Sequence, residues 1–200
     1  MVRFILPVKG LNLGKSRLRV PAAQRSALVT AMLQDCLNAV RETGLGPAVV
    51  VSPDPAVLAL ADAAGAEVLD HAGDLNVAIS AAATQRRCAA LLPDLPALRA
   101  AELVAVLTEH PAGFVPDAAG TGTTLLFGAS LRPRFGPGSA QRHAEAGYRR
   151  VDLPMCGLSA DVDTWEDLLR VRRLGLGRHT ADVLGSLEPP GVGDTSPAGT

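Results

Sequence analysis

Three aspartates stand where they could bind a divalent metal ion. Asp94 comes after an apolar run that has the length of a strand, and Asp161 and Asp163 are separated by one residue. In an extended segment, alternate residues point to the same side. Because carboxylate oxygens suit Mg²⁺, we predict that Asp94, Asp161 and Asp163 bind this metal as a cofactor. The alternative is that Asp163 or Thr164 caps the helix expected at 165–174.

A basic loop follows the first apolar run of the chain. It contains Lys9, Lys15, Ser16 and Arg17, and it has a superficial likeness to a phosphate-binding P-loop. However, three residues instead of four separate its glycines, and Pro21 stands where the helix of a P-loop would continue. A solvated basic loop is the simpler alternative. We favour a phosphate-binding loop of another kind, in which lysines act as point charges and the arginine as a bidentate donor.

The elements that position these residues alternate between strand and helix. Strands are expected at 2–8, 48–52, 66–70 and 88–92, and helices at 21–43, 55–64, 76–86 and 99–110. This alternation predicts an α/β fold with a mostly parallel sheet and helices on both faces. In such folds, ligands bind at the carboxyl ends of the strands, which is where Lys9 and Asp94 fall.

The second half of the chain has a more broken pattern. Strand-like runs are expected at 114–115, 123–127 and 149–153, with glycine-rich turns between them. We expect this half to bind the second substrate. From Ser186 onward, Pro, Gly, Ser and Thr dominate and the apolar pattern stops. We therefore predict one domain over residues 1–185 and a disordered C-terminal tail over residues 186–200.

The composition argues against several classes of partner. Of the 200 residues, 48% are hydrophobic and only 3% aromatic, which suits layered α/β packing and not a stacking surface for single-stranded nucleic acid. The 19 basic residues nearly balance the 20 acidic ones, so no overall field attracts polyanions or anionic lipid. Three scattered cysteines favour a reducing compartment, and the apolar runs are too short for a signal peptide or a membrane span. We expect a cytoplasmic protein that binds neither nucleic acid nor membrane.

Several short blocks of this sequence occur together in one family of nucleotidyltransferases. The first is LPVKGLNLGKSRL at 6–18, and later ones are LNVA, DLPAL, GTGTT, FGPGS and DVDT. With these blocks in this order, the chain resembles the phospholactate or phosphoenolpyruvate guanylyltransferases, the family called CofC or FbiD. DLPAL alone is common among sugar-nucleotide transferases, so the specificity comes from the last three blocks together. Pro93 and Asp74 depart from the family pattern, which has a small residue and a glycine there.

The resemblance implies a single Rossmann-like nucleotidyltransferase domain of the GT-A or MobA-like type. It also implies a reaction, in which the phosphate of a small acid attacks the α-phosphorus of GTP and expels pyrophosphate. The acid is phosphoenolpyruvate or 2-phospho-L-lactate, and the bacterial members of the family favour the first. The product would be enolpyruvyl-2-diphospho-5′-guanosine, which a downstream transferase consumes in coenzyme F(420) biosynthesis.

Carried over position by position, the resemblance implies three groups of site residues. Asp94, Lys15 and Arg17 are expected to be catalytic, Lys9, Lys15, Ser16, Arg17 and Asn76 to bind GTP, and Thr123, Gly136 and Ser139 to bind phosphoenolpyruvate, with Arg142 and His143 as further candidates. Asn76 could equally be a helix cap, and the turn at Gly136 an ordinary turn. Two other functions stay open: another sugar- or cofactor-nucleotidyltransferase, or a nucleotide-binding module without turnover.

Overall fold

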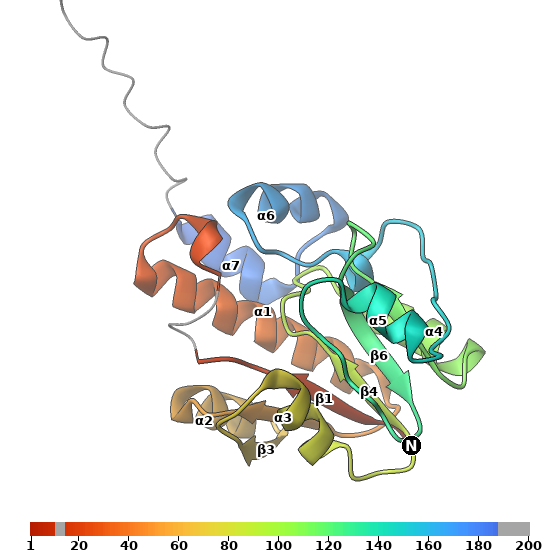
Figure 1. The fold of residues 1–200 in the computed structure, drawn as a ribbon. Coiled ribbons are helices and arrows are strands. Elements are labelled where there is room, and N and C mark those ends of the chain that lie inside the picture. Colours follow the sequence, from red (N-terminus) through yellow and green to blue (C-terminus); the bar gives the residue numbers. More distant parts are fainter. Residues whose placement is uncertain (11–14, 188–200) are drawn as a thin grey trace, which may run out of the picture.

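The fold is built on a six-stranded, mostly parallel sheet (Figure 1). The computed structural model describes residues 1–10 and 15–187 of the chain. The strands lie in the order β3-β2-β1-β4-β6-β5, with bounds β1 Arg3–Pro7, β2 Ala48–Ser52, β3 Glu67–Asp70, β4 Cys88–Leu91, β5 Gly113–Pro116 and β6 Thr123–Gly128. β1 pairs in parallel with β2 and β4, and β2 with β3, whereas β6 is antiparallel to β4 and β5. The predicted α/β class is therefore confirmed.

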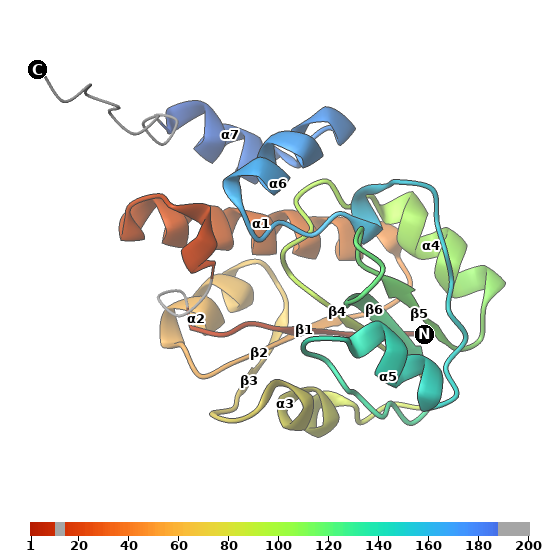
Figure 2. The ribbon, with the colours of Figure 1, turned by 45° about the horizontal axis from the view of Figure 1, so that its top comes forward.

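Helices cover both faces of the sheet, as predicted (Figure 2). Their bounds are α1 Ala22–Thr43, α2 Pro55–Ala63, α3 Leu75–Ala82, α4 Ala100–Glu109, α5 Ser139–Glu145, α6 Trp165–Val171 and α7 Arg178–Ser186, with 3₁₀ turns η1 Ser16–Leu18, η2 Gly157–Ser159 and η3 Arg172–Leu174. Alternate residues of β1 serve opposite faces. Phe4 and Leu6 pack in the core layer of α1, α2 and α4, and Ile5 packs in that of α3 and α5. Burial on both faces explains why β1 is a continuous apolar run.

An outer layer of α6 and α7 lies over α1 (Figure 2). Its apolar cluster joins Leu28 and Met32 of α1 to Leu168 and Val171 of α6, together with Val162 from the segment before α6. This packing returns the segment before α6 to the end of the sheet at which β1 and β4 finish.

Several details differ from the expectation drawn from the sequence. The described stretch 149–153 is not a strand, because Arg150 forms only an isolated bridge with Phe114 of β5. α3 ends at Ala82 and not at residue 86. The Arg3 guanidinium donates to the carbonyl of Ala82 at 3.1 Å and caps this end of the helix. The pattern also gives no clear signal for α5 and α7, which have few apolar residues.

The boundary of the predicted tail falls within α7. This helix continues to Ser186, and residues 188–200, most of that tail, lie outside the described residues. The division into a domain over 1–185 and a disordered tail stays a prediction. In the described ranges, every helix is too short or too polar to cross a membrane.

A buried carboxylate from α1 holds the start of α7. Asp35 is 6% exposed, and its two oxygens accept the backbone N–H groups of His179 and Thr180 at 3.0 and 2.9 Å. Glycine is required at position 177, because a Cβ on Gly177 would lie 2.3 Å from the carboxyl carbon of Asp35. The cap lies 144 residues from His179 in the sequence, so no local pattern predicts this helix.

We predict that Asp35→Ala lowers the free energy of unfolding by roughly 2–4 kcal/mol, since two N–H groups of α7 lose a charged acceptor. Urea unfolding followed by circular dichroism measures the change. The control is Asp182→Ala, an exposed position of the same helix, which should change stability by less than about 0.5 kcal/mol. If Asp35→Ala and the wild-type chain unfold at the same urea concentration, Asp35 does not hold α7.

Candidate active site

A cleft lies at the edge of the sheet where β1, β4 and β5 end. These three strands finish at the same edge because β6 is antiparallel to both of its neighbours. The cleft has a volume of about 320 Å³, and its lining includes Lys9, Lys15, Pro93, Asp94 and Asp163. The structure thus brings together two lysines of the first loop and two of the three predicted metal-binding aspartates, from segments that are far apart in the chain.

The ammonium group of Lys15 lies between two carboxylates. Its Nζ is 2.5 Å from Asp94 Oδ2 and 2.5 Å from Asp163 Oδ1, and the side chains of Lys15 and Asp94 are only 14% and 17% exposed. Burial disfavours the charge on Lys15, but the Asp94 and Asp163 carboxylates outweigh burial and raise the pKa of Lys15 above its usual value. The lysine is therefore a permanent cation at this site.

The backbone on both sides of η1 is strained. Lys15 has φ 58° and Arg19 has φ 54°, in the left-handed region that residues with side chains disfavour. Leu18 is fully buried between them, in the apolar cluster shared with α1 and α6. Packing of Leu18 and the ion pairs of Lys15 together hold this turn and direct the lysine into the cleft.

Val162 fixes the segment before α6 to the loop after β4. It is fully buried, and its N–H donates to the carbonyl of Asp94 at 3.1 Å. Asp161 and Asp163 flank this anchor and are therefore held close to Asp94. Burial, reinforced by the carboxylates of Asp94 and Asp117, raises the pKa of Asp161 to about 7. A cation near these groups would favour the ionised form of Asp161.

Thr164 is the cap of α6. Its hydroxyl accepts the N–H of Asp167 at 3.1 Å, and the Asp167 carboxylate accepts the N–H groups of Asp163 and Thr164 at 3.2 and 2.9 Å. The capping alternative is confirmed for Thr164, while the side chain of Asp163 stays with Lys15.

One oxygen of Asp94 has no hydrogen-bond partner among the described residues. Oδ1 is buried and makes no hydrogen bond with the residues that the structure describes. A buried acceptor of this kind is available to a ligand that supplies a donor or a positive charge. Over residues 1–10 and 15–187, no three Asp, Glu, His or Cys side chains form a metal-binding group as they stand, and Asp94 and Asp163 instead share Lys15.

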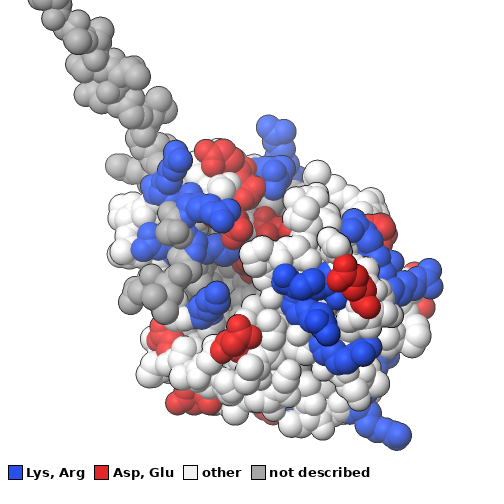
Figure 3. Space-filling view, in the orientation of Figure 1, with Lys and Arg blue, Asp and Glu red and all other residues white. Residues whose placement is uncertain are grey.

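The other basic residues predicted to bind GTP surround the cleft. Lys9 is exposed and lines it, and Arg17 is exposed in a neighbouring hollow of about 540 Å³ that Arg19, Thr164 and Glu166 also line. The side chain of Ser16 lies outside the described part of the structure. Figure 3 shows basic and acidic side chains interspersed on the face in view, without a continuous basic surface there. On this face, any affinity for phosphate therefore depends on local groups of basic side chains.

Asn76 joins α3 to the loop before α5. Its Oδ1 accepts the N–H of Phe135 at 2.7 Å, and its Nδ2 donates to the carbonyl of Phe135 at 3.2 Å. The cap of α3 is Asp74, whose carboxylate accepts the Asn76 N–H at 2.8 Å. The helix-cap alternative for Asn76 is therefore wrong. A contact between Asn76 and GTP stays a prediction. With the two bonds to Phe135 in place, the Asn76 side chain has its second amide hydrogen and one lone pair of Oδ1 left for such a contact.

The residues predicted to bind the acceptor lie together where β6 and α5 begin. Thr123 and Ser139 are each 2% exposed, and the N–H of Ser139 donates to the Gly136 carbonyl at 3.0 Å. Gly136 has φ 120°, a conformation that favours glycine. The N–H of Ala140 donates to the carbonyl of Thr121 at 3.1 Å. The GTGTT and FGPGS blocks are thus tied to each other.

Arg142 and His143 of α5 hold the same loop. The Arg142 guanidinium donates to the carbonyls of Arg134 at 2.9 Å and Pro137 at 2.6 Å. His143 is fully buried, accepts the N–H of Arg134 on Nε2 at 3.0 Å and pairs through Nδ1 with the hydroxyl of Thr123 at 2.9 Å. Burial, together with the charges of Arg142 and Arg134, lowers the pKa of His143 to about 4. The imidazole is therefore neutral at pH 7.

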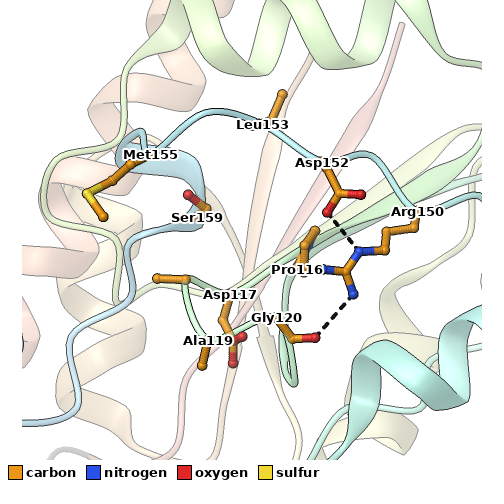
Figure 4. Close-up of a pocket in the computed structure, with 10 residues that line it drawn as sticks. Pro116, Asp117, Ala119, Gly120, Arg150, Asp152, Leu153, Met155 and Ser159 are labelled. Carbon is orange, nitrogen blue, oxygen red and sulfur yellow. Dashed lines mark hydrogen bonds and ion pairs between the residues drawn. The ribbon is translucent and has the colours of Figure 1, made fainter.

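A second hollow, of about 340 Å³, lies beside the GTGTT turn (Figure 4). Asp117 lines it, and its carboxylate accepts the N–H groups of Thr121 and Gly122 at 2.9 and 2.7 Å. Arg150 on the same hollow is paired with Asp152 at 2.7 Å. Asp117 was not predicted from the sequence, although an aspartate shortly before a glycine-rich turn is a signal for such backbone bonds.

Comparison with known proteins gives the family. A family model described as "Guanylyl transferase CofC like" matches residues 2–192. A phosphoenolpyruvate guanylyltransferase of Mycobacterium sp. (strain KMS) is 42% identical, with 92% of both chains covered. Another, from Nocardia farcinica, is 43% identical and covers 92% of this chain and 90% of its own.

Solved structures support the same fold. A nucleotidyl transferase from Methanothermobacter has a TM-score of 0.64 at 16% identity, covering 94% of this chain and 99% of its own. A cytidylyltransferase from Leptospira borgpetersenii has a TM-score of 0.57 at 14% identity, covering 92% of both chains. At such identities the likeness shows the fold alone, which is that of a nucleotidyltransferase domain. The family match and the relatives above 40% identity show more: the chain belongs to the CofC-like guanylyl transferase family.

Proposed function

We propose that this guanylyltransferase transfers GMP from GTP to the phosphate of phosphoenolpyruvate and releases pyrophosphate. The observation that carries the proposal is the cleft in which Lys15 lies between Asp94 and Asp163, in a chain whose relatives are named phosphoenolpyruvate guanylyltransferase. The product, enolpyruvyl-2-diphospho-5′-guanosine, would pass to a downstream transferase of coenzyme F(420) biosynthesis. We place the reaction in the cytoplasm, which suits the free cysteines Cys36 and Cys88.

The reaction requires charge neutralisation more than it requires a base. A phosphate monoester has a second pKa of about 6, so the attacking oxygen of the acceptor is already ionised at neutral pH. This oxygen forms a bond to the α-phosphorus of GTP, while the bond from that phosphorus to the oxygen of the departing pyrophosphate breaks. We propose that Lys9 and Lys15, which line the cleft, and Arg17, which lines the neighbouring hollow, bind the phosphates and stabilise the charge that builds on pyrophosphate.

The carboxylates of the cleft fit the divalent metal ion that nucleotidyltransferases generally use, and we propose Mg²⁺. Asp94 has the buried Oδ1 without a partner in the described residues, and Asp161 and Asp163 flank the Val162 anchor beside it. When bound there, Mg²⁺ would neutralise phosphate charge and polarise the reacting phosphoryl group. We infer that Lys15 exchanges a carboxylate contact for a phosphate oxygen when GTP binds.

Thr123, Gly136 and Ser139 are proposed to bind the acceptor. Hydroxyl groups and a close backbone approach suit a carboxylate or phosphate without adding a further positive charge. The loop that carries Gly136 is fixed from two sides, by Asn76 of α3 and by α5.

An assay with matched substrates tests this function. We expect purified protein with Mg²⁺ to form a GMP adduct of phosphoenolpyruvate, with kcat/KM for GTP at least about 100-fold above that for ATP, CTP or UTP, because a site that hydrogen-bonds one base leaves its polar groups unpaired with another. Pyrophosphate release and mass detection of the adduct measure it. The parallel acceptors are 2-phospho-L-lactate and glucose 1-phosphate. Turnover of glucose 1-phosphate alone would indicate a sugar-nucleotide enzyme, and GTP binding without any adduct would indicate a non-catalytic module.

A further inference from the structure

The imidazole of His143 is enclosed by aromatic rings in the core beside the proposed acceptor site. Its centroid lies 5.8 Å from that of Phe114, 5.2 Å from that of Phe135 and 6.1 Å from that of Tyr148. The residue is fully buried, yet both ring nitrogens have a polar partner. A histidine kept in an apolar enclosure with two directed hydrogen bonds orients its partners.

The backbone determines which nitrogen of the ring carries the proton. The N–H of Arg134 points at Nε2 from 3.0 Å, and a backbone N–H can only donate. Nε2 is therefore the unprotonated nitrogen, and a neutral ring must carry its proton on Nδ1. The lowered pKa of His143, about 4, agrees with a neutral ring. It follows that Nδ1–H donates to the oxygen of Thr123, 2.9 Å away.

This tautomer decides what Thr123 can offer to a ligand. Because the Thr123 oxygen accepts from His143, the hydroxyl keeps its own proton for another partner. Within the described residues, the contact with His143 is the one hydrogen bond of the Thr123 side chain. With the opposite tautomer, the hydroxyl would donate to the ring and present only lone pairs, which repel an anion.

We propose that His143 is a positioning residue that holds the Thr123 hydroxyl as a hydrogen-bond donor to the carboxylate of the acceptor. The inference rests on the proposed function, in which Thr123 binds the small acid. It adds the reason why this hydroxyl favours an anionic group. Because the N–H of Arg134 sets the tautomer of His143, the direction of the Thr123–His143 hydrogen bond depends on the loop before α5.

Two amide substitutions separate the two bonds of the ring. The amide nitrogen of asparagine can take the place of Nδ1, so His143→Asn keeps a donor to Thr123 and loses the acceptor for Arg134. The amide oxygen of glutamine can take the place of Nε2, so His143→Gln keeps the acceptor for Arg134 and loses the donor to Thr123. Both amides are close to the imidazole in polarity, which makes them a matched pair.

We expect His143→Gln to raise KM for phosphoenolpyruvate about 10- to 100-fold with KM for GTP changed less than about threefold, as for loss of one hydrogen bond to a charged group. His143→Asn keeps the donor to Thr123 but loses a bond that holds the Gly136 loop, so it should raise KM for phosphoenolpyruvate clearly less than His143→Gln does. The double variant His143→Gln with Thr123→Val should be no worse than Thr123→Val alone, because both act through one hydroxyl. Additive losses, equal losses of GTP and phosphoenolpyruvate use, or a larger loss in His143→Asn than in His143→Gln would overturn the proposal.

The ¹⁵N chemical shifts of the ring of wild-type His143 give a reading that does not depend on the variants folding. We expect a protonated Nδ1 and an unprotonated Nε2 at pH 7, and the reverse pattern would overturn the proposal. Different results would contradict the proposed function and the role of His143. If wild-type protein makes no adduct with phosphoenolpyruvate, the proposed function fails, whereas normal turnover with a protonated Nε2 removes only the role of His143.

Discussion

Asp94→Asn is expected to lower kcat/KM for GTP and phosphoenolpyruvate by about 1,000-fold, or about 4 kcal/mol of transition-state stabilisation. The substitution keeps the shape of the side chain. It removes the negative charge of Asp94, which pairs with Lys15 and would bind a metal ion. At the buried Oδ1 position, which has no partner in the described structure, a neutral amide atom replaces the carboxylate oxygen. Initial rates of pyrophosphate release over a range of Mg²⁺ concentrations measure the effect.

Asp62→Asn is the matched control, because Asp62 is an exposed aspartate of α2 outside the residues that line the cleft. It should keep the wild-type rate. Circular dichroism and melting temperature must also show that the Asp94 variant is folded. A folded Asp94→Asn protein with a near-normal rate at saturating Mg²⁺ would contradict the assignment of Asp94 to metal binding and catalysis.

Lys15→Met is expected to have two opposite effects. It should lower kcat/KM for GTP by about 100- to 1,000-fold, since a cation that stabilises the transition state is lost. In the absence of substrates, it should tighten Mg²⁺ binding by about tenfold, because Asp94 and Asp163 no longer share an ammonium group. Titration calorimetry with MgCl₂ gives the second quantity without any turnover.

The control for Lys15 is Arg41→Met, which removes an exposed positive charge near the end of α1. Both its turnover and its Mg²⁺ affinity should stay at wild-type values. Weaker or unchanged Mg²⁺ binding in Lys15→Met would show that the lysine and the metal do not compete for the two carboxylates. In that case the ion pairs of Lys15 would be part of the metal site itself.

Local signals in the sequence were sufficient for the first half of the fold. The run 48–52, which is apolar and bounded by turn residues, is β2 with the same bounds, and the helix expected after Pro21 is α1. Parallel pairing followed from the strand–helix alternation, and parallel pairing places Lys9 and Asp94 at one edge. The positions of candidate site residues were therefore predictable wherever a polar residue directly follows a strand.

The partners of the site residues were not predictable, because they come from distant parts of the chain. Asn76 faces Phe135 across 59 residues, and Asp35 caps a helix 144 residues away. Propensity and periodicity describe only neighbours along the chain, so they could not show that Asn76 fixes a loop or that α7 forms at all. For the same reason the run 149–153, which has a strand-like composition, was misread: its backbone joins β5 only through the two hydrogen bonds of Arg149 and Val151 with Phe114, which form an isolated bridge.

The ion pairs of Lys15 join segments that leave the ribosome at different times. Lys15 and Asp163 are 148 residues apart, and the Val162 anchor joins the same two distant segments. A ribosome-bound chain that has emerged only as far as α4 has Lys9, Lys15 and Asp94 but neither Asp161 nor Asp163. Closing so long a loop costs more chain entropy than closing a short one. The complete charge arrangement around Lys15 therefore arises only after residues 161–163 have been synthesised.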